Sequence, residues 1–251
     1  MYYRKYFAGT VENANLTRTT ADISGVGNRT ESYVMDDVIC RAIKETLEDV
    51  EISCEYTSEN SVLQIEGVSV QILRYSNGLY CSANGVVIGN MSSYTPFNGN
   101  NYKFYVTLKG NIDSVLTIAI GYYSLPATDL NGFAIGKGKD LKDGSQIHVI
   151  TLISSAINAS NSSFYIIKDN KIFSDYKSVV NFGFAMPNIQ ALNGNEVTLV
   201  ECVAQAGRFK LNNCYFGNAA LSNGEFYNIG GEIYYKLSSY VLVKCNKEQM
   251  A

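Results

Sequence analysis

The chain has 251 residues, of which 46% are hydrophobic and 17% are charged, and its formal net charge is -3 at pH 7. The 19 Tyr and 11 Phe argue against a disordered chain, which would be poor in aromatic residues. The slight negative charge offers no broad basic face, and no apolar run approaches membrane-spanning length. We therefore expect no nucleic-acid partner and no membrane insertion.

Residues 1–32 are polar and only weakly periodic, and we expect them to form an extended N-terminal arm. An arm at a chain terminus either frays or docks on a partner. Scattered apolar residues at Val11, Leu16, Ile23 and Val26 favour docking.

Residues 33–48 carry the one convincing helical pattern in the sequence. Ser32 suits an N-cap, and Asp36 and Asp37 suit the first turn, where the helix dipole favours negative charge. Such a helix packs on a sheet of its own chain or, less commonly, binds a partner subunit. We predict a docking helix over 33–48, in which Val34, Val38, Ile39 and Ile43 are candidate partner contacts. Its apolar face repeats at spacings of three and four residues: Val34, Met35, Val38, Ile39, Ala42, Ile43, Thr46 and Leu47.

From residue 49 onward the apolar residues alternate with polar ones, as is typical of β-strands. Short alternating segments fill 49–125, which we assign to a first β-unit. Asn-Gly pairs such as Asn84-Gly85 separate several of these segments, and both residues tolerate the positive φ of a type I′ hairpin turn. A linker is predicted over 126–132, and alternation resumes over 133–246, the second β-unit.

This pattern predicts a mainly β fold. We expect antiparallel sandwich or barrel-like units, with one N-terminal amphipathic helix. Whether the two β-units share one core does not follow from the pattern.

Residue types that perform catalysis are sparse. His148, the single histidine, has no Ser or Cys motif beside it and is interpreted as a surface or structurally satisfied residue. The stretch Gly136-Lys137-Gly138-Lys139-Asp140 lacks the spacing of a phosphate-binding loop and is predicted to be a turn. Asp129, Asp140 and Asp143 match no calcium-loop spacing. We expect no enzyme activity, no catalytic residue, no metal site and no cofactor.

The six cysteines show no C-x-x-C spacing, and no signal peptide precedes them. We expect reduced core cysteines in a protein that folds in a reducing cytoplasm.

Tyrosines occur in adjacent aromatic pairs, such as Tyr122-Tyr123 and Tyr234-Tyr235. Successive residues of a strand point to opposite faces, so one member of each pair should fill the core and the other should face outward. Tyr122, Tyr215 and Tyr235 are therefore candidate partner contacts. Ordinary cross-strand pairing within the sheet is the competing interpretation.

Three C-terminal segments carry a family resemblance: residues 209–217 (FKLNNCYFG), 222–237 (SNGEFYNIGGEIYYKL) and 240–245 (YVLVKC). The region 132–245 resembles the closing domains of structural proteins from tailed bacteriophages and phage-like contractile particles of low-GC Gram-positive bacteria. The resemblance implies a virion structural protein of the tail, baseplate or tail fibre. Such a protein is synthesised in the host cytoplasm and works as a homo-oligomer beside other virion proteins in a symmetric particle.

Three alternatives stay open. The nearest is a capsid decoration or head-fibre protein. A second is a glycan-binding adhesin module that recognises a host cell-surface glycan through exposed Tyr residues. The third is a hydrolase whose paired carboxylates come from separate strands.

Overall fold

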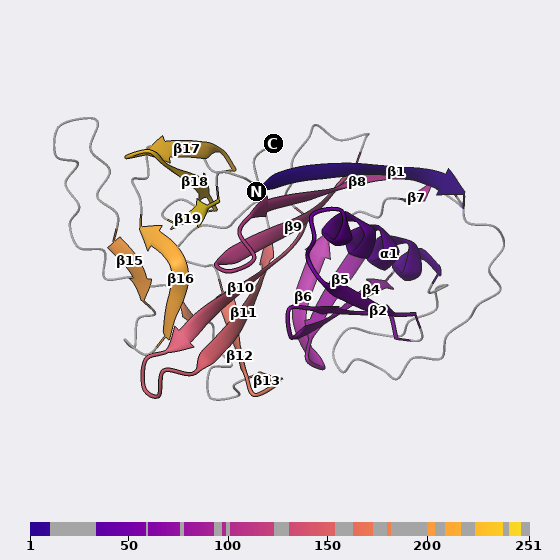
Figure 1. The fold of residues 1–251 in the computed structure, drawn as a ribbon. Helices are drawn as coiled ribbons and strands as arrows, with labels where there is room; N and C mark the ends of the chain where they lie inside the picture. The colour runs from indigo at the N-terminus through magenta and orange to yellow at the C-terminus, as the bar shows by residue number, and fades with distance from the viewer. Residues whose placement is uncertain are drawn as a thin grey trace.

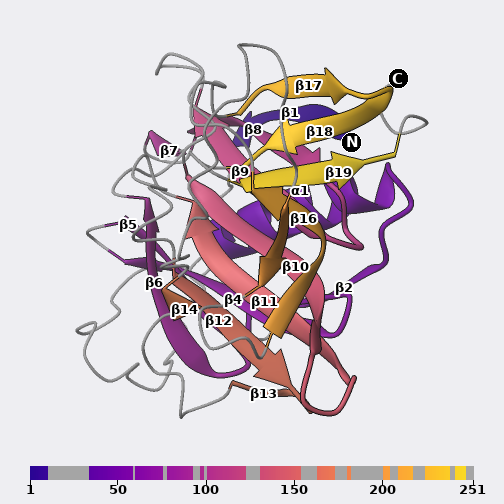
Figure 2. The same ribbon diagram turned by 90° about the vertical axis from the view of Figure 1, so that its left-hand side faces the viewer.

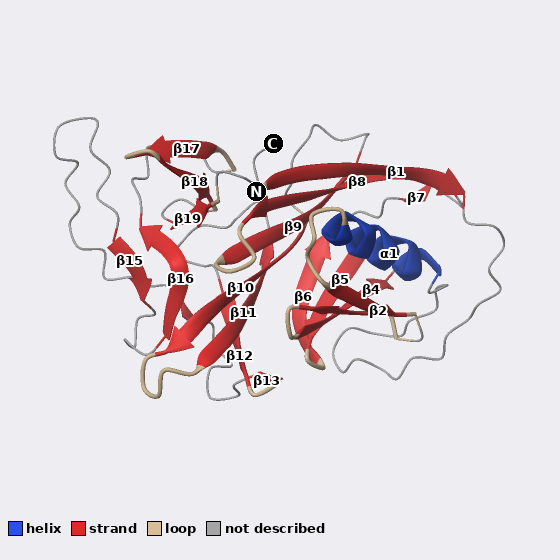
Figure 3. Ribbon diagram, in the orientation of Figure 1, coloured by secondary structure: helices blue, strands red, loops and turns tan. Residues whose placement is uncertain are grey.

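The computed structural model describes residues 1–10, 34–58, 60–75, 78–92, 97–98, 101–122, 131–153, 163–172, 180–181, 200–203, 209–216, 224–237 and 241–246. Within these ranges the protein is mainly β, with two antiparallel sheets and one helix, α1 (Val34–Glu48) (Figure 3).

The strands are β1 (Tyr2–Thr10), β2 (Cys54–Thr57), β3 (Val62–Ile65), β4 (Val68–Tyr75), β5 (Gly78–Ala83), β6 (Val86–Ser92), β7 (Phe97–Asn98), β8 (Asn101–Gly110), β9 (Val115–Tyr122), β10 (Gly132–Asp140), β11 (Gln146–Ile153), β12 (Ser163–Lys168), β13 (Lys171–Ile172), β14 (Val180–Asn181), β15 (Val200–Val203), β16 (Phe209–Phe216), β17 (Phe226–Ile229), β18 (Glu232–Lys236) and β19 (Val241–Cys245).

The small sheet has the strand order β2-β3-β4-β5-β6, a meander of consecutive strands. The large sheet follows the path β1-β8-β9-β10-β16-β19-β18-β17, and β11 leads from the other edge of β10 to β12. Figure 1 shows three layers. The small sheet and α1 lie on the right, strands β8 to β12 in the centre, and β15 to β19 on the left.

Two hydrophobic clusters hold these layers together. The first joins Ile43 of α1 and Leu63 of the small sheet to Phe104 and Leu116 of the central strands. The second joins Val149 and other residues of the opposite central face to the left-hand strands, which lie in front of the central strands in Figure 2. All eight residues of β9 are therefore buried, because the central layer is covered on both faces.

Strand β10 is the point at which the large sheet divides. Its residues Gly132 to Gly136 pair with β9, and its residues Gly138 to Asp140 pair with β16, while β11 pairs along its opposite edge. Strands β9 and β16 therefore leave the same edge of β10 in succession. We call this point the strand fork.

The predicted helix is confirmed, since α1 spans Val34–Glu48 against an expected 33–48. Ile39, Ile43 and Leu47 are fully buried, whereas Arg41 is exposed and pairs with Asp37 one turn earlier. The suggested N-cap lies outside the described residues.

Residues 1–10 differ from the extended arm expected there. They form β1, which pairs with β8 in unbroken register from Tyr2↔Lys109 to Thr10↔Asn101. Phe7 stacks on Phe104 at 5.5 Å between ring centroids, and the amino group of Met1 donates to the carbonyl of Gly110. Pairing with a distant strand supplies the stability that the polar local sequence does not indicate. The rest of the expected arm lies outside the described residues.

The division of the strands into two sheets does not coincide with the expected division into two β-units. The range 49–125 contributes β2 to β6 to the small sheet and β8 and β9 to the large one. Strand β9 pairs directly with β10 beyond the expected linker at 126–132, of which only Asn131 and Gly132 are described. Strand pairing is a long-range property, so alternation along the chain does not reveal it. The hairpin expected at Asn84-Gly85 is confirmed, with φ values of 45° and 79°.

Candidate binding pocket at the strand fork

A depression of about 490 Å³ lies at the strand fork. It is lined by polar and charged side chains from β10, the start of β11, β16 and the turn between β8 and β9: Asp113, Lys137, Lys139, Gln146, Lys210, Asn212, Asn213 and Tyr215. The volume is within the range of small-molecule sites, about 300–1,000 Å³.

Two glycines of β10 make the fork possible. A Cβ on Gly136 would lie 2.3 Å from the carbonyl oxygen of Ser114, and one on Gly138 would lie 2.4 Å from that of Lys210. The predicted turn at 136–140 is therefore wrong, because these residues form the middle and end of β10. The glycines serve the close approach of neighbouring backbones, which is a recognised use of glycine inside a strand.

The lysines of β10 alternate with these glycines and therefore share one face of the sheet. In the strand register Lys139 lies opposite Lys210 of β16 on one side and opposite Gln146 of β11 on the other. Asn213, with φ 48°, marks where β16 changes from pairing with β10 to pairing with β19. Asn212 and Asn213, at this change of partner, both line the depression.

Lys137 connects the pocket to the small sheet. Its Nζ lies 2.9 Å from Oε2 of Glu66, in the β3–β4 turn, and 3.1 Å from Oδ1 of Asp113. Burial lowers the pKa of Lys137, but the hydrogen bonds to Glu66 and Asp113 outweigh it and the net shift is upward. Lys137 is therefore a charged residue whose charge is compensated locally.

His148 lies beside this ion-pair group, on the neighbouring strand β11. It is half-buried, it faces Lys137 in the β10–β11 register, and its Nε2 would lie 3.4 Å from a Cβ on Gly67. Burial lowers its pKa and the Lys137 charge lowers it further, while Glu66 acts in the opposite direction. The net shift in the pKa of His148 is downward, which favours the neutral imidazole.

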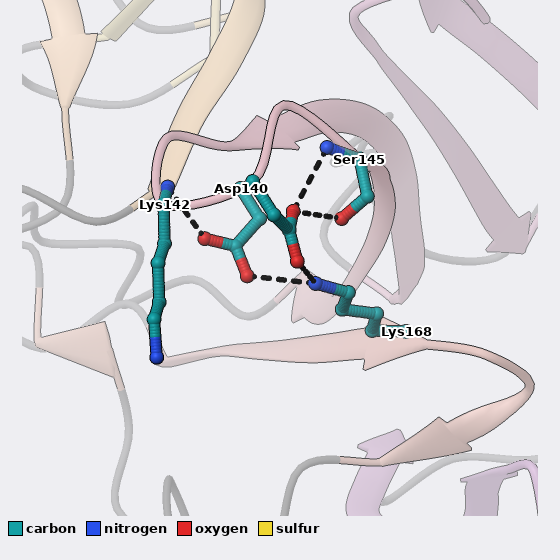
Figure 4. Close-up of polar contacts among 5 residues, drawn as sticks. Asp140, Lys142, Ser145 and Lys168 are labelled. Atoms are coloured by element: carbon teal, nitrogen blue, oxygen red, sulfur yellow. Dashed lines mark hydrogen bonds and ion pairs between the residues drawn. The ribbon is translucent and has the colours of Figure 1, made fainter.

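The β10–β11 hairpin is closed by a second ion-pair group (Figure 4). Lys168 of β12 bonds Asp140 at 2.9 Å and also contacts Asp143. Asp140 accepts the backbone N–H of Lys142, and Asp143 accepts from Ser145. Hydrogen bonds from Lys168 and Ser145 lower the pKa of Asp143 to about 2.

The ion pairs of Asp140 and Asp143 concern the residues that were considered for a calcium loop. Two of the three aspartates weighed for a metal loop bind a lysine, and Asp129 lies outside the described residues. Nowhere in the described part of the chain do three or more His, Cys, Asp or Glu side chains come together in a group that could hold a metal ion.

Two of the four predicted helix contacts, Ile39 and Ile43, are buried inside the chain itself. Ile39 and Ile43 have no exposed surface, Val38 is half-buried, and the side chain of Val34 is outside the description. The helix lies between strands of both sheets. In this conformation the two isoleucines leave no surface for a partner.

The three predicted tyrosines are also placed differently from one another. Tyr122 and Tyr235 are buried, at 6% and 5% exposure. Tyr215 is half-buried, lines the fork pocket and packs edge-to-face on Tyr234. Tyr122 packs in the cluster that includes α1 and the small sheet, and Tyr235 packs in the cluster on the opposite face of the central strands. Strand alternation does not predict this packing between layers.

The five cysteines whose side chains are described are free and buried, as expected for reduced core residues. Burial raises the pKa of each described thiol, to about 12 for Cys54. The side chain of Cys202 is outside the description.

Comparison of the chain with protein-family models, with curated proteins and with solved structures found no match. Among the described residues, α1 is too short and too polar to cross a membrane.

Sequence reasoning missed the pocket lysines and the exposed aromatic residues of β1. The alternation of Gly136 and Gly138 with Lys137 and Lys139 was visible as a strand pattern with one cationic face. Nothing in that segment indicates that Lys210 lies opposite.

Proposed function

We propose that this protein is a non-catalytic structural component of a tailed phage or phage-like contractile particle, in the tail, baseplate or fibre apparatus, and that it self-associates through β1. The resemblance of region 132–245 to virion proteins supports the particle. The observation that carries the assembly role is the position of β1 at one end of the large sheet, where β8 is its partner among the described strands.

The backbone of this edge is suited to strand addition. Met1 and Gly110 exchange both backbone hydrogen bonds, so the odd-numbered residues of β1 bond β8. Antiparallel alternation then directs the N–H and C=O groups of Tyr2, Arg4, Tyr6 and Ala8 away from the sheet. An unbroken edge of this kind is a template for pairing with another strand.

The side chains of β1 also suit a contact surface at this edge. Tyr2 and Tyr6 are 40% and 57% exposed, and they are two of the four exposed large hydrophobic residues in the described chain. The guanidinium of Arg4 lies 4.3 Å from the ring centroid of Tyr105 and 5.9 Å from that of Tyr2. Both cation–π contacts hold the Arg4 side chain beside these rings. By contrast, the β6 edge of the small sheet carries two register irregularities, a feature that blocks edge pairing.

A second copy of the chain is the partner that fits this edge. Antiparallel pairing of two β1 strands about a twofold axis at Tyr6 places Arg4 opposite Ala8 and Lys5 opposite Phe7. Like charges then avoid each other, whereas an axis at Arg4 or Lys5 would bring identical cations together. Such an isologous contact is the commonest basis of homodimers.

The test is the oligomeric state of the purified protein by light scattering coupled to gel filtration. We expect a dimer, and we expect Ala8→Pro to be monomeric, because proline removes an outward N–H without removing a bond to β8. Ala8→Ser keeps that N–H and serves as the matched control. A monomeric wild-type protein, or a dimeric Ala8→Pro variant, contradicts the self-association.

The proposed role in a phage or phage-like particle is tested separately, by identifying the genes that flank this one. Sheath, tube or baseplate genes beside it would support a tail position, and head genes would support the capsid decoration variant. Neighbouring genes unrelated to a virion would contradict both.

A further inference from the structure

We propose that His148 is a proton sensor that keeps the β3–β4 turn docked on the central strands while its imidazole is neutral and releases the turn when the imidazole is protonated. The release alters the fork pocket, because it separates Glu66 from Lys137, a residue that lines that pocket. The switch is independent of the proposed self-association, since β1 lies at one end of the large sheet and pairs with neither β10 nor β11.

The β3–β4 turn contacts the central strands through its two middle residues. Glu66 and Gly67 have φ values of 50° and 83°, as a two-residue type I′ turn requires. The carboxylate of Glu66 pairs with the Nζ of Lys137 on β10. Gly67 lies beside the ring of His148 on β11, where a Cβ on the glycine would be 3.4 Å from Nε2 and 3.6 Å from Cε1. One turn therefore rests on an ion pair at one strand and on an imidazole at the next.

A positive charge on His148 conflicts with these surroundings. The ring is half-buried and Gly67 covers part of it, so a charged imidazole would lack hydration. Lys137 lies directly opposite His148 in the β10–β11 register, and like charges in such positions repel each other. Burial and the Lys137 charge accordingly lower the pKa of His148, against an opposing effect of Glu66. Withdrawal of the turn exposes the ring to water, so protonation and docking oppose each other.

The described strands on the other sides of His148 bring no charge to face it. The residue opposite it on β12 is Ile167, and β6, which packs against β11, contains no ionisable residue. Asp113 is paired with Lys137. The charges that act on His148 are those of Lys137 and Glu66.

The release is confined to the turn and occurs in mild acid. Leu63 of β3 and Val70 of β4 are fully buried in the hydrophobic cluster that includes the central strands, and they hold the small sheet in place. Because folding lowers the pKa of His148, docking is complete above pH 6.5, the ordinary pKa of histidine. It is lost as pH falls from there through the lowered pKa.

NMR spectroscopy tests this switch, because His148 is the single histidine of the chain and its ring gives one titrating set of signals. We expect a titration midpoint below 6.5. At pH 7.5 a nuclear Overhauser effect should join the ring to the α-proton of Gly67 that occupies the position of the missing Cβ. This effect should disappear with the same midpoint. A midpoint at or above 6.5, or an Overhauser effect that survives the titration, would overturn the proposal.

Two lysine substitutions on β10 give a matched comparison. Lys137→Met removes the like charge opposite His148 and should raise the midpoint. Lys139→Met makes the same change in net charge, but Lys139 lies opposite Gln146, so the midpoint should stay unchanged. Amide correlation spectra establish that each variant is folded. Equal shifts in the two variants would count against the switch, because they would reduce the coupling to a general charge effect.

A third variant separates the imidazole from other acid effects. His148→Gln cannot gain a proton, so the amide signal of Gly67 should stay constant between pH 7.5 and pH 5.5, an interval above the ordinary titration range of Glu66. The same signal should move in the wild-type protein. Equal movement in both proteins would mean that a group other than His148 controls the turn, and the proposal would fail.

Discussion

The Nζ of Lys5 lies 2.7 Å from Oδ2 of Asp49, which joins the first strand of the protein to the end of its helix. Tyr3 donates from its hydroxyl to the same carboxylate oxygen at 2.8 Å, and Lys5 also pairs with Glu45. A negative charge just beyond a helix C-terminus opposes the helix dipole, so Lys5 offsets a local repulsion. Accordingly, the pKa of Asp49 is lowered, chiefly by its hydrogen bond to Lys5.

Asp49→Asn should destabilise the protein by about 1 kcal/mol, because it weakens two hydrogen bonds that hold β1 to α1 and the residues are partly solvated. Urea unfolding measures this difference in the free energy of unfolding. Glu48→Gln is the matched control, since the partner of Glu48 is Lys44 on the same exposed helix face. Its effect should stay below about 0.5 kcal/mol. Equal effects of the two changes would show that the strand–helix contact contributes nothing specific.

Acid should weaken the β10–β11 hairpin through Asp143. The pKa of this carboxyl is lowered to about 2 in the folded protein from 3.8, so its contribution to stability is complete above pH 4. Protonation removes that contribution as pH falls from about 4 to about 2. Asp143→Asn should therefore lose less stability over this interval than the wild-type protein.

Urea unfolding at pH 5, 4, 3 and 2.5 follows this difference, with Asp113→Asn as a control. Asp113 is also paired with a lysine, so the comparison separates the hairpin from acid effects elsewhere. Parallel stability curves for the wild-type protein and Asp143→Asn would exclude Asp143 as a contributor.

Gly138→Ala should cost about 3 kcal/mol, at the upper end for overpacking. The added Cβ would lie 2.4 Å from the backbone carbonyl of Lys210, which has no rotamer to change. Gly144→Ala meets no atom within 4 Å, although its φ of +74° adds strain of about 1 kcal/mol. Thermal unfolding ranks the two. A smaller loss at Gly138 would mean that β16 moves away from β10 without cost.

The two sheets should unfold together, because one hydrophobic cluster contains residues of both. Leu63→Ala in the small sheet and Leu116→Ala in the large sheet should each cost about 2–5 kcal/mol. Each should shift a single transition that far-UV circular dichroism and tyrosine fluorescence report identically. Two separate transitions, with each substitution affecting only one, would show that the sheets are independent domains.

Local sequence determined the secondary structure well. Apolar spacing of three and four residues located α1 within one residue at its start, and alternation located most strands, because both patterns record which face of an element is buried. The hairpin at Asn84-Gly85 followed from the φ values that these two residues tolerate.

Tertiary structure alone decided how those elements pair and which strands are covered on both faces. Alternation marks Tyr122 and Tyr235 as strand residues, but both are buried by distant segments: Tyr122 belongs to the cluster that includes α1 and the small sheet, and Tyr235 belongs to the cluster on the opposite face of the central strands. The strand fork, the opposition of Lys139 and Lys210, and the pairing of β1 with β8 likewise depend on long-range register. Register is fixed by the summed packing of whole sheets, and no single segment of this chain encodes it.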